Sequence, residues 1–295
     1  MDQFMQAVIN GIMLGGFYAV MVLGFSIIWG VMGVINLAHG EFVMIGAYIT
    51  WYLNKTYGWE PFATLLVVIP VMFLLGYILQ KILINRVIER PYLISLLVTF
   101  SLSIIISNTF KLIFTATPRT VDTVLSGFWR VGESVTVPIT KTYLIVAALI
   151  IMGALHLFLQ RTRLGKSIRA AAQNREAARI VGIEIGAVYA ITFAICIAIT
   201  GTSGTLISPI QAIYPFMGAS LTLKAFAITA MSGLGSIPGA LVGGIFLGLI
   251  ETFIATYVSG VGTNLGIVSS YVILVIVLVT RPQGLFGGLK AAEAQ

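Results

Sequence analysis

Residues 31–48 read VMGVINLAHGEFVMIGAY and place Asn36, His39 and Glu41 between two long apolar runs. An ionised carboxylate in the middle of a bilayer costs about 3 kcal/mol on insertion scales, so Glu41 should be paired or hydrated. His39 is a candidate partner for Glu41 if the helix breaks at Gly40. As metal ligands the three side chains are too few, because a structural site normally has four donors.

Two interpretations of this stretch remain open. It is either an ordinary loop between two spans or a broken helix that faces the interior of the protein. Irregular backbone at membrane depth is tolerated only where protein or water covers it, so a broken helix would lie beside a passage. The residues that would then line or brace the passage are Asn36, His39, Gly40 and Glu41.

The composition of the whole chain is that of a membrane protein. Of its 295 residues, 58% are hydrophobic and 9% are charged, and the mean hydropathy is +1.02. A soluble domain carries about 25% charged residues. We therefore predict an all-α, polytopic transmembrane helical bundle that forms a single domain over residues 1–295.

The apolar runs predict eight to ten spans, with broken or short helices near 31–48 and 232–240. The N-terminal MDQFMQAVINGIML has no basic n-region, so we expect a retained first helix rather than a signal peptide. The candidate spans are 6–30, 40–54, 62–84, 92–114, 142–160, 187–208, 218–234, 238–258 and 264–280.

The second interruption, SGLGSIPGA at 232–240, combines Pro238 with several glycines. It predicts either a connecting loop or a second helix break that lines the passage. The residues concerned are Ser232, Gly235 and Ser236. Glycines at four-residue spacing also predict close helix packing. They are Gly235, Gly239 and Gly243, Gly244 and Gly248, and Gly11 and Gly15.

Glu251 lies in the following apolar run and raises the same energetic cost as Glu41. We expect it to pair with Lys224 or to face a cavity.

The net charge of +7 comes largely from two short loops, 81–91 and 161–186. Basic residues in short loops beside spans mark the cytoplasmic side, so the charge reports topology and not a nucleic-acid partner. Segment 115–141 then lies in the periplasm, where its alternating Thr and Val predict a small hairpin or an extended cap. The basic residues are Lys81, Arg86 and Arg90 in one loop, and Arg161, Arg163, Lys166, Arg169, Arg175 and Arg179 in the other.

The loop 161–186 also has helical composition from about 167 to 182, with Ser167 as the predicted N-cap. A short helix rich in small residues, presented on the cytoplasmic face, suits the groove of another protein. A solvated basic loop is the alternative. The residues that would make the contact are Arg169, Ala170, Ala171, Arg175, Glu176, Ala177, Ala178, Arg179 and Gly182.

Two short motifs suggest enzymatic chemistry, and both lack an essential part. LGKS at 164–167 has the end of a P-loop, but Gln160 occupies the position of the first glycine. GTSG at 201–204 matches a serine-protease motif, yet both histidines lie upstream and no base follows it. We expect no catalytic site, no ATPase site, no metal and no cofactor bound by this chain.

Four stretches carry a resemblance to a known family. Glu176-Ala177-Ala178 with Gly182 resembles the EAA-x3-G loop of permeases in ATP-binding-cassette importers, although the later Ile-x-Leu-Pro of that loop is absent. GVINLAHGEFVMIGAY, GLGSIPGALVGGIFLGLIE (233–251) and TRPQGLFG (280–287) are similar to the branched-chain amino acid permeases of the high-affinity leucine/isoleucine/valine type. Urea and short-amide permeases share these motifs.

The resemblance implies a division of labour. The cytoplasmic loop would dock as a coupling helix onto two ATPase subunits, which bind ATP and Mg²⁺. A second, different permease subunit, a periplasmic substrate-binding protein and the lipid bilayer would be the other partners, in a bacterial inner (cytoplasmic) membrane. The chain would then translocate branched-chain or other apolar amino acids by alternating access.

Two alternative functions remain. One is a urea or short-chain amide permease of the same family. The other is a passive small-solute channel, which would conduct without ATP and would not need the Ala-rich cytoplasmic helix.

Overall fold

The computed structural model describes residues 2–131, 135–233, 235–258 and 262–280. Apolar runs form helices here because a helix satisfies its own backbone hydrogen bonds where water is absent. The first elements are α1 Asp2–Met32, α2 His39–Tyr57, α3 Leu65–Ile82, the 3-10 turn η1 Ile84–Arg86 and α4 Tyr92–Phe114. Then come β1 Phe128–Val131, β2 Val135–Pro138 and α5 Ile139–Arg161. The last are α6 Arg163–Gln173, α7 Arg175–Ile180, α8 Ile185–Ile207, α9 Met217–Ser232, α10 Ile237–Tyr257 and α11 Gly262–Thr280.

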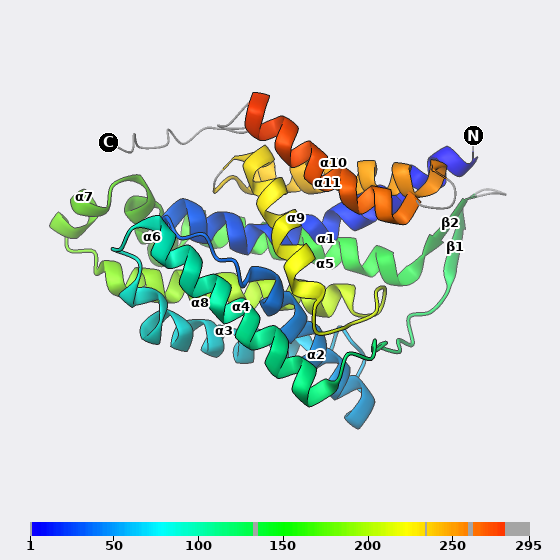
Figure 1. Ribbon diagram of the computed structural model, residues 1–295, viewed down its shortest axis with the longest axis horizontal. Helices are drawn as coiled ribbons and strands as arrows, with labels where there is room; N and C mark the ends of the chain where they lie inside the picture. Colours follow the sequence, from blue (N-terminus) through cyan, green and yellow to red (C-terminus); the bar gives the residue numbers. More distant parts are fainter. Residues whose placement is uncertain (1, 132–134, 234, 259–261, 281–295) are drawn as a thin grey trace.

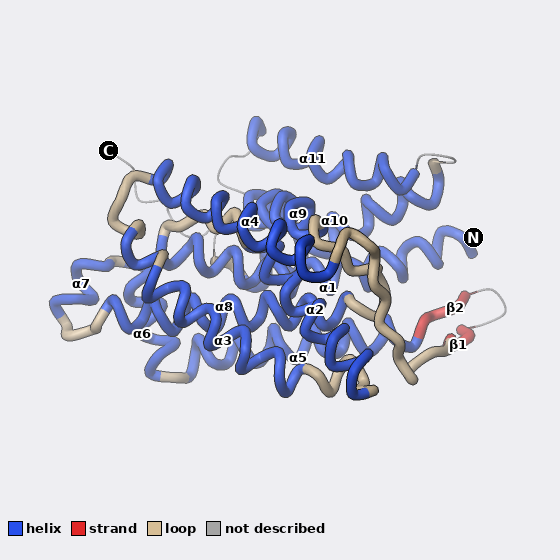
Figure 2. Tube along the Cα trace, turned by 60° about the horizontal axis from the view of Figure 1, so that its bottom comes forward, coloured by secondary structure: helices blue, strands red, loops and turns tan. Residues whose placement is uncertain are grey.

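The predicted all-α bundle is confirmed, and each of the nine candidate spans corresponds to one helix (Figure 2). Of the described helices, 6 are long and apolar enough to cross a membrane by length and composition. These are α1, α3 with η1, α4, α5, α8 and α10. Helix α9, with 16 residues, is shorter than the roughly 20 that a span needs.

The centre of the bundle is formed by α1 and α8. In the most apolar window of α1, 89% of the residues are buried inside the protein, whereas the figure is 22% for α4 and for α5. The peripheral helices turn aliphatic side chains outward, as a surface that faces lipid tails should. Examples are Leu66, Leu97, Ile105, Leu112 and Ile150.

The glycine stripes pack helices at backbone distance, as predicted. A Cβ atom on Gly244 of α10 would lie 2.7 Å from the backbone nitrogen of Ala19 and 2.8 Å from the carbonyl oxygen of Gly15 in α1. Gly248 and Gly11 meet one turn further along the same pair of helices. Because any side chain here would push the backbones apart, α1 and α10 form a rigid pair.

The two ends of the bundle have different chemistry (Figure 1). We call the end that carries residues 83–91, α6 and α7 the basic end, where Arg175 forms an ion pair with Glu89. The opposite end carries the β1–β2 hairpin, in which Phe128 lies opposite Pro138, and we call it the hairpin end. Gln6 donates a 2.8 Å hydrogen bond to the Thr136 carbonyl, so α1 starts at the hairpin end. The two basic loops therefore meet on one side and segment 115–141 lies on the other, as predicted.

Residues 281–295, which include most of the TRPQGLFG stretch, lie outside the described residues.

The close packing of α1 on α10 gives the first prediction. Gly244→Leu should lower the free energy of unfolding by about 1–3 kcal/mol, because overpacking forces the two backbones apart. Thermal unfolding of the purified protein in mild detergent measures the loss. Gly153→Leu is the matched control, since a Cβ atom at Gly153 of α5 meets nothing within 4 Å. Equal stability of the two variants would contradict the packing described here.

Candidate functional site

The polar stretch near residue 36 is a break between two helices, and it turns back into the bundle. Helix α1 ends at Met32, Gly33 has a left-handed φ of 66°, and α2 begins at His39. His39 Nε2 donates a hydrogen bond of 2.8 Å to the Met21 carbonyl, well before the end of α1. Residues 33–38 therefore lead back beside α1 into the bundle, as the broken-helix interpretation predicts.

Hydroxyl side chains from other helices satisfy the backbone of this break. The Leu37 amide donates to Thr99 Oγ1 of α4 at 3.1 Å. The Gly40 amide donates to Thr222 Oγ1 of α9 at 2.8 Å. Such partners are needed because an unpaired backbone group in hydrocarbon costs several kcal/mol. The break is therefore held between α1, α4 and α9.

The predicted pairing of His39 with Glu41 is wrong. His39 points to α1, where its ring packs edge-on against Phe25 at 5.2 Å between centroids. Glu41 points to α4, where Ser107 Oγ donates to Glu41 Oε1 at 3.1 Å. The two side chains diverge because the helix breaks before His39 and not at Gly40, so both lie in one regular turn.

Several polar atoms of this stretch keep hydrogen-bonding capacity unused. Asn36, His39 and Glu41 are all buried, at 0–1% exposure. Asn36 Nδ2, His39 Nδ1 and Glu41 Oε2 have no hydrogen-bond partner within the described part of the chain. Buried polar groups are normally paired, and an unpaired one costs about 1–3 kcal/mol. These atoms thus keep unused hydrogen-bonding capacity in the interior of the bundle.

The second interruption is also a break, and its predicted residues have other partners. The Gly235 amide donates to Ser26 Oγ of α1 at 2.8 Å, and Ser236 Oγ caps α10 by accepting from the Gly239 amide at 3.0 Å. Ser232 Oγ lies 3.5 Å from the Thr229 carbonyl of its own helix. The structure thus ties Gly235 to α1, and among the described residues no hydrogen bond joins Ser232, Gly235 or Ser236 to Glu41.

Glu251 pairs with Lys224, which is the first of the two arrangements that the sequence predicts. Lys224 Nζ lies 2.7 Å and 3.0 Å from the two Glu251 oxygens. Tyr18 of α1 donates to Glu251 Oε2 at 2.6 Å and accepts from Lys224 at 2.7 Å. The side chains of Lys224 and Glu251 are only 8% and 12% exposed. This buried pair neutralises both charges and ties α9 to α10 and α1.

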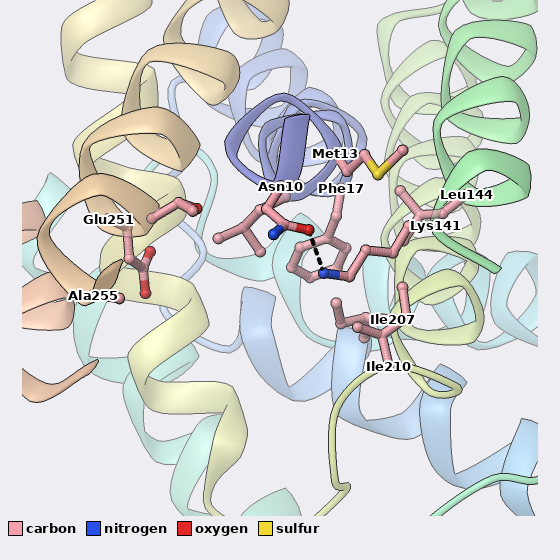
Figure 3. Close-up of a pocket in the computed structure, with 11 residues that line it drawn as sticks. Asn10, Met13, Phe17, Lys141, Leu144, Ile207, Ile210, Glu251 and Ala255 are labelled. Carbon is pink, nitrogen blue, oxygen red and sulfur yellow. Dashed lines mark hydrogen bonds between the residues drawn. The ribbon is translucent and has the colours of Figure 1, made fainter. Parts of the chain in front are cut away.

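A cavity of about 320 Å³ lies nearby, between α1, α5, the end of α8 and α10 (Figure 3). Its wall is mostly apolar, and Lys141 Nζ donates to Asn10 Oδ1 across one side of it at 3.0 Å. Glu251 reaches its opposite side. Among the residues that line it, none belongs to the two predicted passage stretches. The cavity is therefore separate from the site around Glu41.

The loop 161–186 forms two helices where the sequence predicts one. Thr162, and not Ser167, caps α6 by accepting from the Gly165 amide. Asn174 ends α6 and caps α7, accepting from the Ala177 amide at 2.9 Å. Gly182 closes α7 with a left-handed φ of 87°, which a side chain would strain. The split occurs because an asparagine side chain competes for backbone donors and favours a cap over a helix interior.

The remaining predicted contact residues fall on two faces of these helices. Ala171 and Ala178 are buried against the bundle, and Ala170 is half-buried. The exposed ones are Arg169, Glu176, Ala177 and Arg179.

Sequence reasoning missed two residues at the tip of α7. Ile180 and Val181 are 85% and 75% exposed, beyond the basic end of the bundle. Their signal in the sequence is weak, because aliphatic residues are common throughout this chain. Only their position among charged residues distinguishes them from residues that face lipid.

In the described ranges, no group of three or more His, Cys, Asp or Glu side chains lies close enough to hold a metal ion.

Comparison with known proteins gives a consistent result. Residues 7–279 match the family model described as "Branched-chain amino acid transport system / permease component". The chain is 30% identical to the high-affinity branched-chain amino acid transport system permease protein LivH of Escherichia coli, over 96% of both chains. It is 31% identical to the corresponding protein BraD of Pseudomonas aeruginosa, also over 96% of both. A ribose import permease protein, RbsC of Escherichia coli, is 26% identical over 52% of this chain and 46% of its own. No solved structure matches the chain.

The buried ion pair gives the second prediction. Lys224→Met leaves the Glu251 carboxylate buried without its cation and should cost about 3–5 kcal/mol of stability. The double variant Lys224→Met/Glu251→Leu removes both charges and should regain most of that loss. Thermal unfolding in detergent compares the three proteins. If the single variant proves as stable as the unaltered protein, the pair contributes nothing.

Proposed function

The chain belongs to the family of permease components of branched-chain amino acid transport systems, and we propose that it is the membrane subunit of an ATP-driven importer. In this proposal it moves branched-chain or other apolar amino acids by alternating access, in a bacterial inner membrane. Two ATPase subunits would bind ATP and Mg²⁺, and this chain would perform no covalent chemistry. A second permease subunit and a periplasmic binding protein would complete the assembly.

The observation that carries the proposal is the apolar tip of α7. Ile180 and Val181 lie on a basic, water-facing end, where exposed aliphatic side chains mark a protein contact. The tip is small and convex, with Ala177 exposed beside it. This shape suits insertion into a groove on a partner, as an ATPase subunit would provide.

The surroundings of α7 offer a route by which the partner could move the membrane helices. Arg175 of α7 forms its ion pair with Glu89, which lies in the loop that leads into α4. Ala178 of α7 is buried against the bundle. A displacement of α7 by a partner would therefore pull on the start of α4 as well as on α8.

The assembly itself is tested by gentle detergent extraction of the tagged chain from its native membrane, with identification of the proteins that copurify. We expect two ATPase chains and a second permease. Recovery of an intact homo-oligomer without ATPase, in repeated preparations, would support the passive-channel alternative instead.

The tip of α7 gives the third prediction. Ile180→Asp with Val181→Asp should abolish copurification of the ATPase and lower ATP-dependent leucine uptake at least tenfold, because charges would replace the apolar contact. Val124→Asp is the control, since Val124 is 88% exposed but lies in segment 115–141, which sits toward the hairpin end. Normal ATPase recovery with the double variant would exclude α7 as the docking element.

A further inference from the structure

Helix α4 is unusual among the peripheral helices because it buries only hydroxyl side chains. Its buried residues recur every fourth position, on one face. Most of its apolar residues point outward, and those that pack against the core are only partly buried, namely Leu102, Ile106, Phe110 and Phe114. The buried residues are Ser95, Thr99, Ser103 and Ser107. We call the contact between this face and the 33–41 stretch the hydroxyl seam.

The break and the start of α2 follow the hydroxyl seam along its length. Thr99 bonds the backbone of the break, accepting from the Leu37 amide and lying 3.1 Å from the Ile35 carbonyl. Two turns further toward the hairpin end, Ser107 donates to Glu41. The seam is therefore a polar strip through an otherwise apolar layer.

Glu41 is the only carboxylate that the described residues place on this seam, and it has no cation. Glu251, the other buried acid, is neutralised by Lys224. Within the ranges that the structure describes, no Lys, Arg or His forms an ion pair with Glu41. One of its oxygens, Oε2, has no hydrogen-bond partner there. A fully buried carboxylate in this condition is a strong site for an ammonium group.

The basic end of the seam opens into a cavity of about 200 Å³. Ser95, the first hydroxyl of α4, lines it together with Gly33 and Val34 of the break. Glu89 and Arg90 form its charged rim. At roughly 30 Å³ for each water, the cavity has room for several waters or a small solute.

The hairpin end of the seam is closed by aromatic rings. Tyr48 of α2 stacks on Phe114 of α4 at 4.7 Å and meets Phe110 at 5.1 Å. Trp51 joins the cluster, and the Arg119 guanidinium lies 4.7 Å from its ring. The seam thus has a cavity at its basic end, where Ser95 lines it, and is closed by aromatic rings at the other end.

We propose that the hydroxyl seam is the binding site for the ammonium group of the transported amino acid, with Glu41 as the acceptor and Ser103 and Ser107 beside it. This rests on the proposed importer function. The apolar side chain of the amino acid would lie along α2 and α4, and the aromatic cluster would be the outer gate. A neutral amide or urea could donate a hydrogen bond to Glu41 but would lack the charge pairing of an ammonium group, so the site favours a cationic group.

The first test is accessibility. In a Cys196→Ala background, which has no other cysteine, Ser103→Cys should react at least tenfold faster with a charged, membrane-impermeant methanethiosulfonate than Ser101→Cys. Ser101 is the matched control because it is an exposed serine of the same helix, bonded only to its own helix at the Leu97 carbonyl. The reagent is added to the whole transporter in inside-out vesicles, where the basic end faces the medium. Equal rates would overturn the proposal.

The second test is recognition. Leucine should slow the labelling of Ser103→Cys, and isocaproic acid, which lacks the ammonium group, should not. Adding Glu41→Gln should raise the leucine concentration needed for protection by about 10- to 100-fold, as expected for a lost charged hydrogen bond. Glu41→Asp should restore part of the protection that leucine gives. Absence of protection by leucine, or protection unchanged by Glu41→Gln, would overturn the proposal.

These measurements distinguish a failure of the importer proposal from a failure of the ammonium-site proposal. ATP-dependent leucine uptake by the unaltered complex tests the importer function without reference to Glu41. If uptake is present and the labelling results are negative, only the site is wrong. If the complex takes up urea or acetamide and not leucine, the importer of amino acids and its ammonium site are both wrong.

Discussion

Hydrocarbon offers no partner to a polar group at membrane depth, and α1 supplies partners for several of the polar groups that this chain buries. Its Met21 carbonyl accepts from the first break, its Ser26 hydroxyl accepts from the second, and its Tyr18 hydroxyl completes the buried ion pair of α9 and α10. Hydrocarbon offers no substitute for any of them. Displacing α1 would expose all of these groups together, so α1 is the fixed element of the bundle.

The other helices divide into rigid and adjustable parts. Helices α1 and α10 touch through glycines at backbone distance, as do α2 and α8, where Gly204 meets the Val43 carbonyl. Helix α4 meets its neighbours through hydroxyl groups and a few aromatic rings, which can exchange partners at low cost. A transport cycle that rocks α4 against a rigid core would open and close the hydroxyl seam without breaking the central packing.

Hydropathy was enough to predict the nine helices, and glycine spacing predicted the close packing at Gly11, Gly15, Gly244 and Gly248. For Glu251 the sequence left two arrangements open, a pair with Lys224 or a place beside a cavity, and the structure shows both. The direction of the Glu41 side chain could not be predicted, since it depends on where the first break falls. The division of the 161–186 loop into two helices at Asn174 could not be predicted from composition, because it depends on backbone geometry. The tip residue Ile180 was missed because exposure, and not residue type, distinguishes it. The hydroxyl residues of α4 recur every fourth position in the sequence, but their role becomes apparent only when the structure places Glu41 beside them.

The central place of α1 also has a consequence for biosynthesis. Helix α1 is made well before its partner α10, which does not begin until residue 237. At about 5–20 residues per second, α1 spends tens of seconds among lipids or in the insertion machinery before α10 arrives. The most apolar 18-residue window of α1 has a mean hydropathy of 2.1, which suits a helix that lies alone in the membrane during that interval. Little of α1 meets lipid in the finished protein. Its apolar character is therefore required during synthesis, while α1 is still an isolated helix.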